Sequence, residues 1–178
     1  MSKAPAKELL AFWLVPTEPA RSYFVSLIRD FAARFDAPIF EPHVTLHGTD
    51  PGGEDGQKLV NRVVARTKRC RLRIAGIGHS QKFTKTLFVQ FDPDDEVAAL
   101  SAKFRAASKS PVDYELNPHL SLIYKELPAA EKAAIAANLT IPFSDVSFDS
   151  VKAVITPAEI HSRAAVEAWR VVAEAKLG

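Results

Sequence analysis

The chain of 178 residues has the length of one compact domain, and its 47% hydrophobic and 25% charged residues are typical of a globular protein. The formal net charge of +2 excludes a polycation that coats nucleic acid, although it suits a modest affinity for anionic substrates. The single cysteine, Cys70, excludes an intramolecular disulfide and is predicted to be a small buried residue, not a catalytic thiol.

Residues 1–10 are charged and lack the apolar segment of a secretion signal. No apolar run approaches the ~20 residues that a membrane-spanning helix needs. We therefore expect a soluble, cytoplasmic protein with no membrane partner. No dimerisation helix is evident, so the expected oligomeric state is a monomer.

Hydrophobic periodicity predicts alternating strands and helices along the first half of the chain. Phe24, Ile28 and Phe31 recur at helical spacing, whereas residues 43–47 alternate between polar and apolar as a half-buried strand does. The predicted elements of this half are a strand at 11–16, a helix at 18–35, a strand at 43–47, a loop at 48–56, a helix at 57–66 and a strand at 71–77.

The second half is predicted to repeat this order. Its elements are a strand at 86–91, a helix at 94–107, an alternating strand at 119–124, a helix at 128–138, a strand at 146–155 and a last strand at 168–175. His43 follows Trp13 by 30 residues and His119 follows Phe88 by 31, and a proline precedes each histidine. The matched spacing favours a duplicated lobe over the chance alternation of any α+β chain. We expect a single domain over residues 1–178, made of two intertwined lobes.

The two histidines lie in similar tripeptides, His43-Val44-Thr45 and His119-Leu120-Ser121. Successive side chains of a strand point to opposite faces, so each histidine shares a face with the hydroxyl two residues on, about 6.6 Å along the strand. The residues between them can contribute to the core. If the lobes face one another, two imidazoles and two hydroxyls converge on one cleft.

This set of groups suits the hydrolysis of a phosphodiester. One neutral histidine can take a proton from the attacking water while the other, protonated, gives one to the leaving oxygen, because histidine titrates near neutral pH. The hydroxyls of Thr45 and Ser121 can donate hydrogen bonds to the non-bridging phosphate oxygens. A five-membered cyclic phosphate is already strained, so the chemistry needs no metal or other cofactor.

The sequence resembles the 2H phosphoesterase superfamily. Pro42-His43-Val44-Thr45-Leu46 and Pro118-His119-Leu120-Ser121-Leu122 are similar to its paired signatures. Phe12-Trp13-Leu14-Val15-Pro16 and Tyr124 are most similar to its plant- and yeast-type cyclic phosphodiesterase branch. The similar order of elements covers roughly residues 9–177.

The resemblance implies an α+β fold with two pseudo-symmetric lobes, whose antiparallel sheets face a central cleft and whose helices lie outside. It implies hydrolysis of nucleoside 2',3'-cyclic phosphates, usually to 2'-phosphates, or of ADP-ribose 1'',2''-cyclic phosphate. His43 and His119 would then be the acid/base pair, and Thr45 and Ser121 would bind phosphate. Trp13 and Tyr124 would line the pocket.

Three aromatic residues are candidates for contacts with the nucleobase or ribose. Trp13 and Tyr124 can stack or donate a phenolic hydrogen bond, although Trp13 on so apolar a strand can equally pack in the core. Tyr124 lies five residues after His119, so it reaches the cleft only beyond a strand end or a bulge. Phe83 is a further stacking candidate, for which core packing is the competing role.

Other histidines carry weaker signals. His43 and His47 are four residues apart, which on a helix would suggest metal ligands, but on a strand they stand about 13 Å apart. We therefore expect no metal site, and a place for His47 at the cleft edge or on the surface. No motif surrounds His79 or His161, and neither is predicted to take part in the chemistry.

Two alternatives to a small-nucleotide cyclic phosphodiesterase remain open. The stretch 66–73 holds five basic residues, which suits either an RNA-binding face or a solvated helix end. The first alternative is accordingly an enzyme acting on RNA ends with 2',3'-cyclic phosphates, or a 2'-5' RNA ligase-like relative. The second is a non-catalytic nucleotide- or RNA-binding module. The near-symmetry of the two motifs makes either histidine a candidate for the acid, and the orientation of the substrate decides between them.

Overall fold

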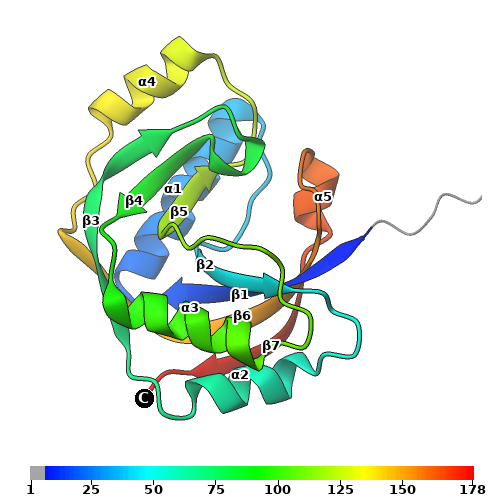
Figure 1. Cartoon of the computed structure of the whole chain (residues 1–178). Coiled ribbons are helices and arrows are strands. Elements are labelled where there is room, and N and C mark those ends of the chain that lie inside the picture. The colour runs from blue at the N-terminus through cyan, green and yellow to red at the C-terminus, as the bar shows by residue number, and fades with distance from the viewer. Residues whose placement is uncertain (1–6) are drawn as a thin grey trace, which may run out of the picture.

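The computed structural model describes residues 7–178 as an α+β fold (Figure 1). The strands are β1 (Glu8–Pro16), β2 (Val44–Thr49), β3 (Cys70–His79), β4 (Leu87–Phe91), β5 (His119–Ile123), β6 (Asp145–Pro157) and β7 (Arg170–Lys176). The helices are α1 (Ala20–Phe35), α2 (Gly56–Val64), α3 (Asp95–Ala107), α4 (Ala129–Asn138) and α5 (Arg163–Glu167), with a 3-10 turn, η1, at Phe83–Lys85. Every element predicted from periodicity is confirmed to within a few residues, whereas η1 and α5 were not predicted.

Local sequence signals fix several helix ends. The Asp55 side chain accepts a hydrogen bond from the Lys58 amide and begins α2, and the Asp94 side chain accepts one from the Val97 amide and begins α3. Helix α1 ends at Asp36, which adopts a left-handed conformation with φ of 49°.

All strand pairings are antiparallel, and they form two lobes that share β6. One lobe has the order β2-β1-β6-β7 and the other β5-β4-β3-β6, in which β3 pairs with the first residues of β6. The lobes also touch where β2 pairs with β5 through Val44 and Leu120. The strand pairings therefore form a closed circuit, β1-β2-β5-β4-β3-β6-β1, with β7 attached outside it.

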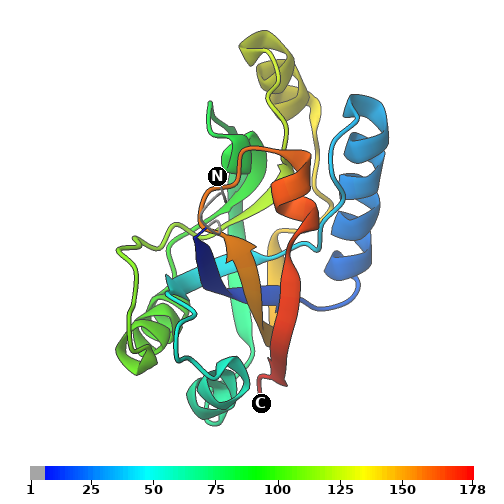
Figure 2. The same cartoon turned by 90° about the vertical axis from the view of Figure 1, so that its right-hand side faces the viewer.

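The helices cover the outer faces and cross between the lobes. Helix α1 follows β1 but packs on β5 of the other lobe, and α3 follows β4 but packs on β2. Helix α2 packs on β7 and β6, and α4 packs on β3. Accordingly, α4 lies at one end of the molecule and α2 with α3 at the other, while the sheets occupy the middle (Figures 1 and 2). The predicted bilobal arrangement, with antiparallel sheets and outer helices, is confirmed.

Both histidine strands carry a β-bulge at the same place. Between β1 and β2 the pairing runs from Trp13 and Thr45 to Phe12 and His47, which leaves Leu46 as the extra residue. Between β4 and β5 it runs from Phe88 and Ser121 to Leu87 and Ile123, which leaves Leu122 as the extra residue. Each bulge lies three residues after the histidine of its strand, so the pseudo-symmetry extends to irregularities of the backbone.

No helix within residues 7–178 is both long and apolar enough to cross a membrane. The start of the N-terminal segment, on which the expected lack of a secretion signal rests, lies outside the described residues.

Candidate functional site

A cleft of about 530 Å³ lies between the two lobes. Five of the residues predicted for the site line it, namely Trp13, His43, Thr45, His119 and Tyr124. Ser121 and Phe83 are not among its lining residues. The fold thus brings the two motif strands to one cavity. Alternation of side chains along each strand places the histidine on the face that meets this cavity.

The two histidines are held in the same way. His43 Nδ1 lies 2.7 Å from the Glu41 carbonyl oxygen, and His119 Nδ1 lies 2.7 Å from the Asn117 carbonyl oxygen. A carbonyl oxygen can only accept, so in both rings Nδ1 carries the proton and donates it. Nε2 is therefore the free nitrogen of each ring, available as a base when neutral and as an acid when protonated.

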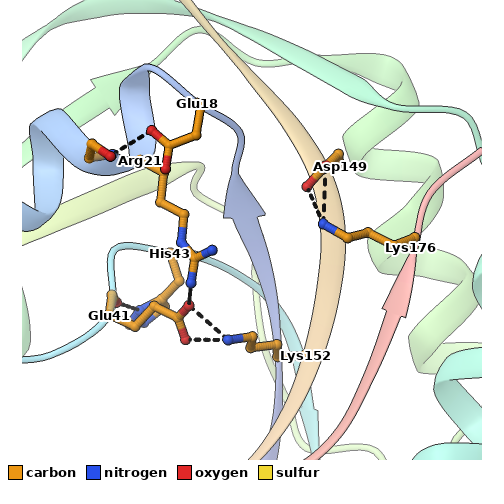
Figure 3. A network of polar contacts seen from close by, with 8 residues as sticks. Glu18, Arg21, Glu41, His43, Asp149, Lys152 and Lys176 are labelled. Atoms are coloured by element: carbon orange, nitrogen blue, oxygen red, sulfur yellow. Dashed lines mark hydrogen bonds and ion pairs between the residues drawn. The ribbon is translucent and has the colours of Figure 1, made fainter.

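An ion-pair cluster fixes the residue that orients His43 (Figure 3). The Glu41 carboxylate accepts from Arg21 at 2.9 Å and from Lys152 at 2.8 Å. The Lys152 side chain is only 12% exposed, so this pair is well shielded from water. Because both cations hold the Glu41 side chain, its backbone carbonyl presents a fixed acceptor to His43.

A neutral network does the same for His119. Gln90 Nε2 donates to the Asn117 side-chain oxygen at 2.8 Å and to the Pro118 carbonyl at 2.9 Å. Gln90 pairs directly with His119 across β4 and β5, so the amide sits beside the ring that it helps to position.

Trp13 lines the cleft and also covers the ring of His43. The two rings are stacked, with centroids 3.8 Å apart and planes inclined by 10°, and Trp13 is 4% exposed. Burial lowers the pKa of His43 to about 4, and the nearby His119 also lowers it, against the hydrogen bond to Glu41, which raises it. His43 is therefore neutral in the free protein at pH 7.

His119 is more accessible and lies near cations. Burial lowers its pKa, the charges of Lys85 and Lys82 lower it further, and the Asn117 carbonyl opposes the shift. Phe88 takes the place next to His119 that Trp13 takes next to His43, but edge-on, with ring centroids 5.5 Å apart. The two histidines are thus equivalent in backbone position but differ in environment.

The two motif hydroxyls also differ. Thr45 lines the cleft, and its side chain makes no hydrogen bond within residues 7–178. Ser121 is buried, and its Oγ–H donates to the Thr84 carbonyl at 2.8 Å. A serine hydroxyl has one hydrogen to give, so Ser121 here holds the segment that carries Thr84, a residue that does line the cleft.

The bulges decide where two further residues point. The extra residue Leu122 reverses the facing of the chain after it, so Tyr124 joins His119 at the cleft although it lies five positions along. The extra residue Leu46 likewise turns His47 away from His43, opposite Phe12 of the core. The expectation of a cleft-edge or surface His47 was wrong, since the residue is 1% exposed and lies edge-on to Tyr114.

Tyr124 is mostly buried at the cleft wall. Burial raises the pKa of its hydroxyl, which therefore stays protonated and can donate a hydrogen bond. Phe83 stacks behind it, with ring centroids 6.3 Å apart and planes inclined by 15°, in a small apolar cluster. Phe83 thus supports Tyr124 from behind.

Several cleft residues had no sequence motif to reveal them. The β3–β4 loop contributes Lys82, Thr84 and Lys85, and the β6–β7 connection contributes Glu159, His161 and Trp169. His161 was predicted to take no part, yet it lines the cavity. The only hint in the sequence was that each polar segment joins two predicted strands, since loops commonly carry binding groups.

Other predicted features lie away from the cleft. None of the five basic residues of 66–73 lines it, and Arg71 pairs with Asp145 at 2.5 Å. Cys70 is buried, and burial, with Glu96 and Asp94 nearby, raises the pKa of its thiol to about 11, as expected for a packing residue. In the described part of the chain, no group of three or more histidine, cysteine, aspartate or glutamate side chains is placed to hold a metal ion.

Known proteins share this sequence pattern and fold. A family model described as the 2'-5' RNA ligase superfamily matches residues 16–156. A cyclic phosphodiesterase from Arabidopsis thaliana is 22% identical over an alignment of 175 residues that covers 96% of this chain and 96% of that protein.

Two solved structures show the same architecture. LigT of E. coli, complexed with 3'-AMP, superposes with a TM-score of 0.57 at 13% identity, over 96% of this chain and 98% of that chain. The protein TT0787 of Thermus thermophilus superposes with a TM-score of 0.58 at 18% identity, over 95% of this chain and 97% of that one. At these identities the superpositions establish a common fold.

Proposed function

Because the chain belongs to the 2'-5' RNA ligase superfamily, the family of 2H phosphoesterases, we propose that it hydrolyses cyclic phosphodiesters of small nucleotides without a metal ion. The substrate class comprises nucleoside 2',3'-cyclic phosphates, opened to the 2'-phosphate, and ADP-ribose 1'',2''-cyclic phosphate. One observation carries the proposal: two histidines with the same Nδ1–H to carbonyl hydrogen bond line one cleft, and this bond leaves Nε2 as the nitrogen available for chemistry in each ring.

The reaction needs two proton transfers, and the two rings can supply both. A neutral Nε2 takes a proton from water as the water oxygen bonds to phosphorus, and the ring P–O bond breaks as the protonated Nε2 gives its proton to the leaving oxygen. After turnover the two rings have exchanged protonation states, and exchange with solvent restores them. Each acid or base can contribute ~10² to 10⁴ in rate.

The remaining cleft groups can bind the phosphate and the nucleoside. The free hydroxyl of Thr45 is the proposed donor to a non-bridging oxygen, and Ser121 contributes by holding the Thr84 segment. The Tyr124 hydroxyl is the proposed donor at the other wall. A nucleotide ligand also agrees with the family, since LigT of E. coli is known in complexes with 3'-AMP and with ATP.

The first test is hydrolysis of the four nucleoside 2',3'-cyclic phosphates in the presence of EDTA, with products identified by phosphorus NMR. We expect turnover to a single isomer. His43→Ala and His119→Ala should each lower kcat by several orders of magnitude while leaving substrate affinity nearly unchanged. Binding without turnover by the unmutated protein would instead favour a non-catalytic nucleotide-binding module.

A second substrate separates the acid from the base. In a cyclic phosphorothiolate, sulfur replaces the leaving oxygen, and a thiolate departs without needing a proton. The variant that lacks the acid should therefore recover most of its activity on this substrate, while the variant that lacks the base should not. Equal recovery of both variants, or of neither, would contradict the division of roles.

A further inference from the structure

Two lysines of the β3–β4 loop face the cleft without a counter-ion. Lys82 and Lys85 both line it, and neither forms an ion pair with any acidic residue between positions 7 and 178. The two carboxylates that line the same cavity, Glu115 and Glu159, lie on other segments. The cleft thus holds two ammonium groups that nothing in the described structure neutralises.

The lysines concentrate positive charge on the His119 side of the cleft. Lys85 Nζ lies 4.4 Å from the centroid of the Phe88 ring, which lies edge-on to His119. Burial and the charge of Lys82 lower the pKa of Lys85, and both lysines lower that of His119. The like charges of the exposed Lys82 and the partly buried Lys85 repel one another, so an anion between them would be stabilised.

The loop that carries the lysines is held in place by buried side chains. Lys132, which is 2% exposed, donates to the Ser80 carbonyl at 2.6 Å, and Ser121 donates to the Thr84 carbonyl. Ser80 Oγ donates to the Lys85 carbonyl at 2.6 Å, and the buried Thr86 donates to the Phe83 carbonyl at 3.1 Å. A backbone fixed at this many points presents its lysines at little entropic cost.

We propose that Lys82 and Lys85 bind a second phosphate of the substrate, attached elsewhere on the nucleotide that carries the cyclic phosphate. This inference rests on the proposed function. The reacting phosphate must contact the free Nε2 of both His43 and His119, whereas Lys85 Nζ lies over the Phe88 ring, which meets only His119. This off-centre position suits an anionic group that neighbours the reacting one.

Two kinds of substrate supply this chemistry. A free nucleotide can carry a 5'-phosphate or 5'-diphosphate, and an RNA end carries the phosphodiester that joins it to the preceding nucleotide. Both place a phosphate on the 5' side of the ribose whose cyclic phosphate reacts.

The test compares substrates that differ only in this group. Adenosine 2',3'-cyclic phosphate is compared with its 5'-phosphate, its 5'-diphosphate and a dinucleotide that ends in the same cyclic phosphate. We expect kcat/KM to be at least about tenfold higher for the substrates with a second phosphate than for adenosine 2',3'-cyclic phosphate. The reason is that a lysine ammonium group can form a charge-assisted hydrogen bond with that phosphate. In the double variant Lys82→Met/Lys85→Met the ratio of kcat/KM with and without the second phosphate should fall to about 1. The control is Lys103→Met, which replaces an exposed residue of α3 and should leave this ratio unchanged.

Each outcome has a defined meaning. A lysine-dependent preference for the 5'-phosphorylated mononucleotides identifies a free nucleotide as the source, and one for the dinucleotide alone identifies an RNA end. A ratio near 1 in the unmutated protein overturns the proposal. So does an equal loss on all four substrates in the double variant, since the lysines would then act on the reacting phosphate.

A binding measurement separates this inference from the proposed function. If the unmutated protein hydrolyses no cyclic phosphate, the proposed function fails, and calorimetry with inorganic pyrophosphate still tests the lysines. We expect pyrophosphate to bind the unmutated protein and to lose at least tenfold in affinity in the double variant. Equal affinities overturn the lysine site. Thermal unfolding of the double variant shows that it is folded.

Discussion

His43 and His119 show how one backbone position can acquire two proton affinities. Both donate Nδ1–H to the carbonyl two residues earlier, so their hydrogen bonds do not distinguish them. The difference comes from what covers each ring: Trp13 stacks flat on His43, while Phe88 meets His119 edge-on. A flat aromatic cover excludes more water, and the charged imidazolium depends most on water.

The pH dependence of kcat/KM should follow from these environments. With His43 as the proposed base and His119 as the proposed acid, activity should fall at low pH when His43 gains its proton and at high pH when His119 loses its own. The pKa of His43 is lowered to about 4, and that of His119 is lowered from its usual 6.5. We expect a bell-shaped profile with its maximum on the acid side of neutrality, measured with a nucleoside 2',3'-cyclic phosphate. A maximum above pH 7 would contradict this account.

Removing the aromatic cover should move one limb of that profile. In Trp13→Ala, water reaches His43 and its pKa should rise from about 4 towards 6.5. Titration of the ring signals by NMR measures the shift directly, and the acid limb of kcat/KM should move up with it. Val171→Ala, at an exposed position, is the control. A His43 pKa unchanged in Trp13→Ala would show that Trp13 is not the cause.

The bulged strands β2 and β5 show what local pattern can and cannot predict. Alternation of polar and apolar residues predicts both strands and places each histidine with the hydroxyl that follows, because these are properties of neighbouring residues. It does not reveal that Leu46 and Leu122 are bulged, since a bulge depends on the register with the partner strand. Hence the predicted place of His47 at the cleft edge or surface was wrong. Tyr124 reaches the cleft because the bulge reverses the facing of the residues that follow it.

Loop residues were harder to predict for a related reason. Lys82 and Lys85 lie near His119 because β3 and β4 form a hairpin whose loop contacts β5 through η1. The crossing of α1 and α3 between the lobes is likewise set by long-range packing that no short window of sequence contains.

The β3–β4 loop should depend on its buried anchor. Lys132 reaches from α4 to the Ser80 carbonyl, and Lys132→Met keeps most of its apolar bulk but removes the hydrogen bond. We expect faster amide hydrogen–deuterium exchange over residues 80–86, with the rest of the sheet unchanged. Lys103→Met is again the matched control. Unchanged exchange in this loop would show that its other hydrogen bonds suffice.

At the scale of the whole molecule, β6 makes the two lobes interdependent. Its Phe148 pairs with Pro16 of β1 on one side and with Cys70 of β3 on the other, and its side chain is fully buried. The exchange of α1 and α3 adds a second connection, because each lobe is covered by a helix that follows a strand of the other. Neither lobe can bury its apolar surface alone, which is the physical requirement for cooperative unfolding.

This interdependence predicts that the chain unfolds as a single unit. Both tryptophans, Trp13 and Trp169, belong to the lobe of β1 and β7, whereas Leu72 is fully buried on β3 of the other. Leu72→Ala should lower the free energy of unfolding by about 2 to 5 kcal/mol. In a cooperative unit it lowers the urea midpoint measured by tryptophan fluorescence as much as the midpoint measured by far-ultraviolet circular dichroism. If the lobes were independent, the circular dichroism would show two steps and the fluorescence midpoint would stay where it is in the unmutated protein.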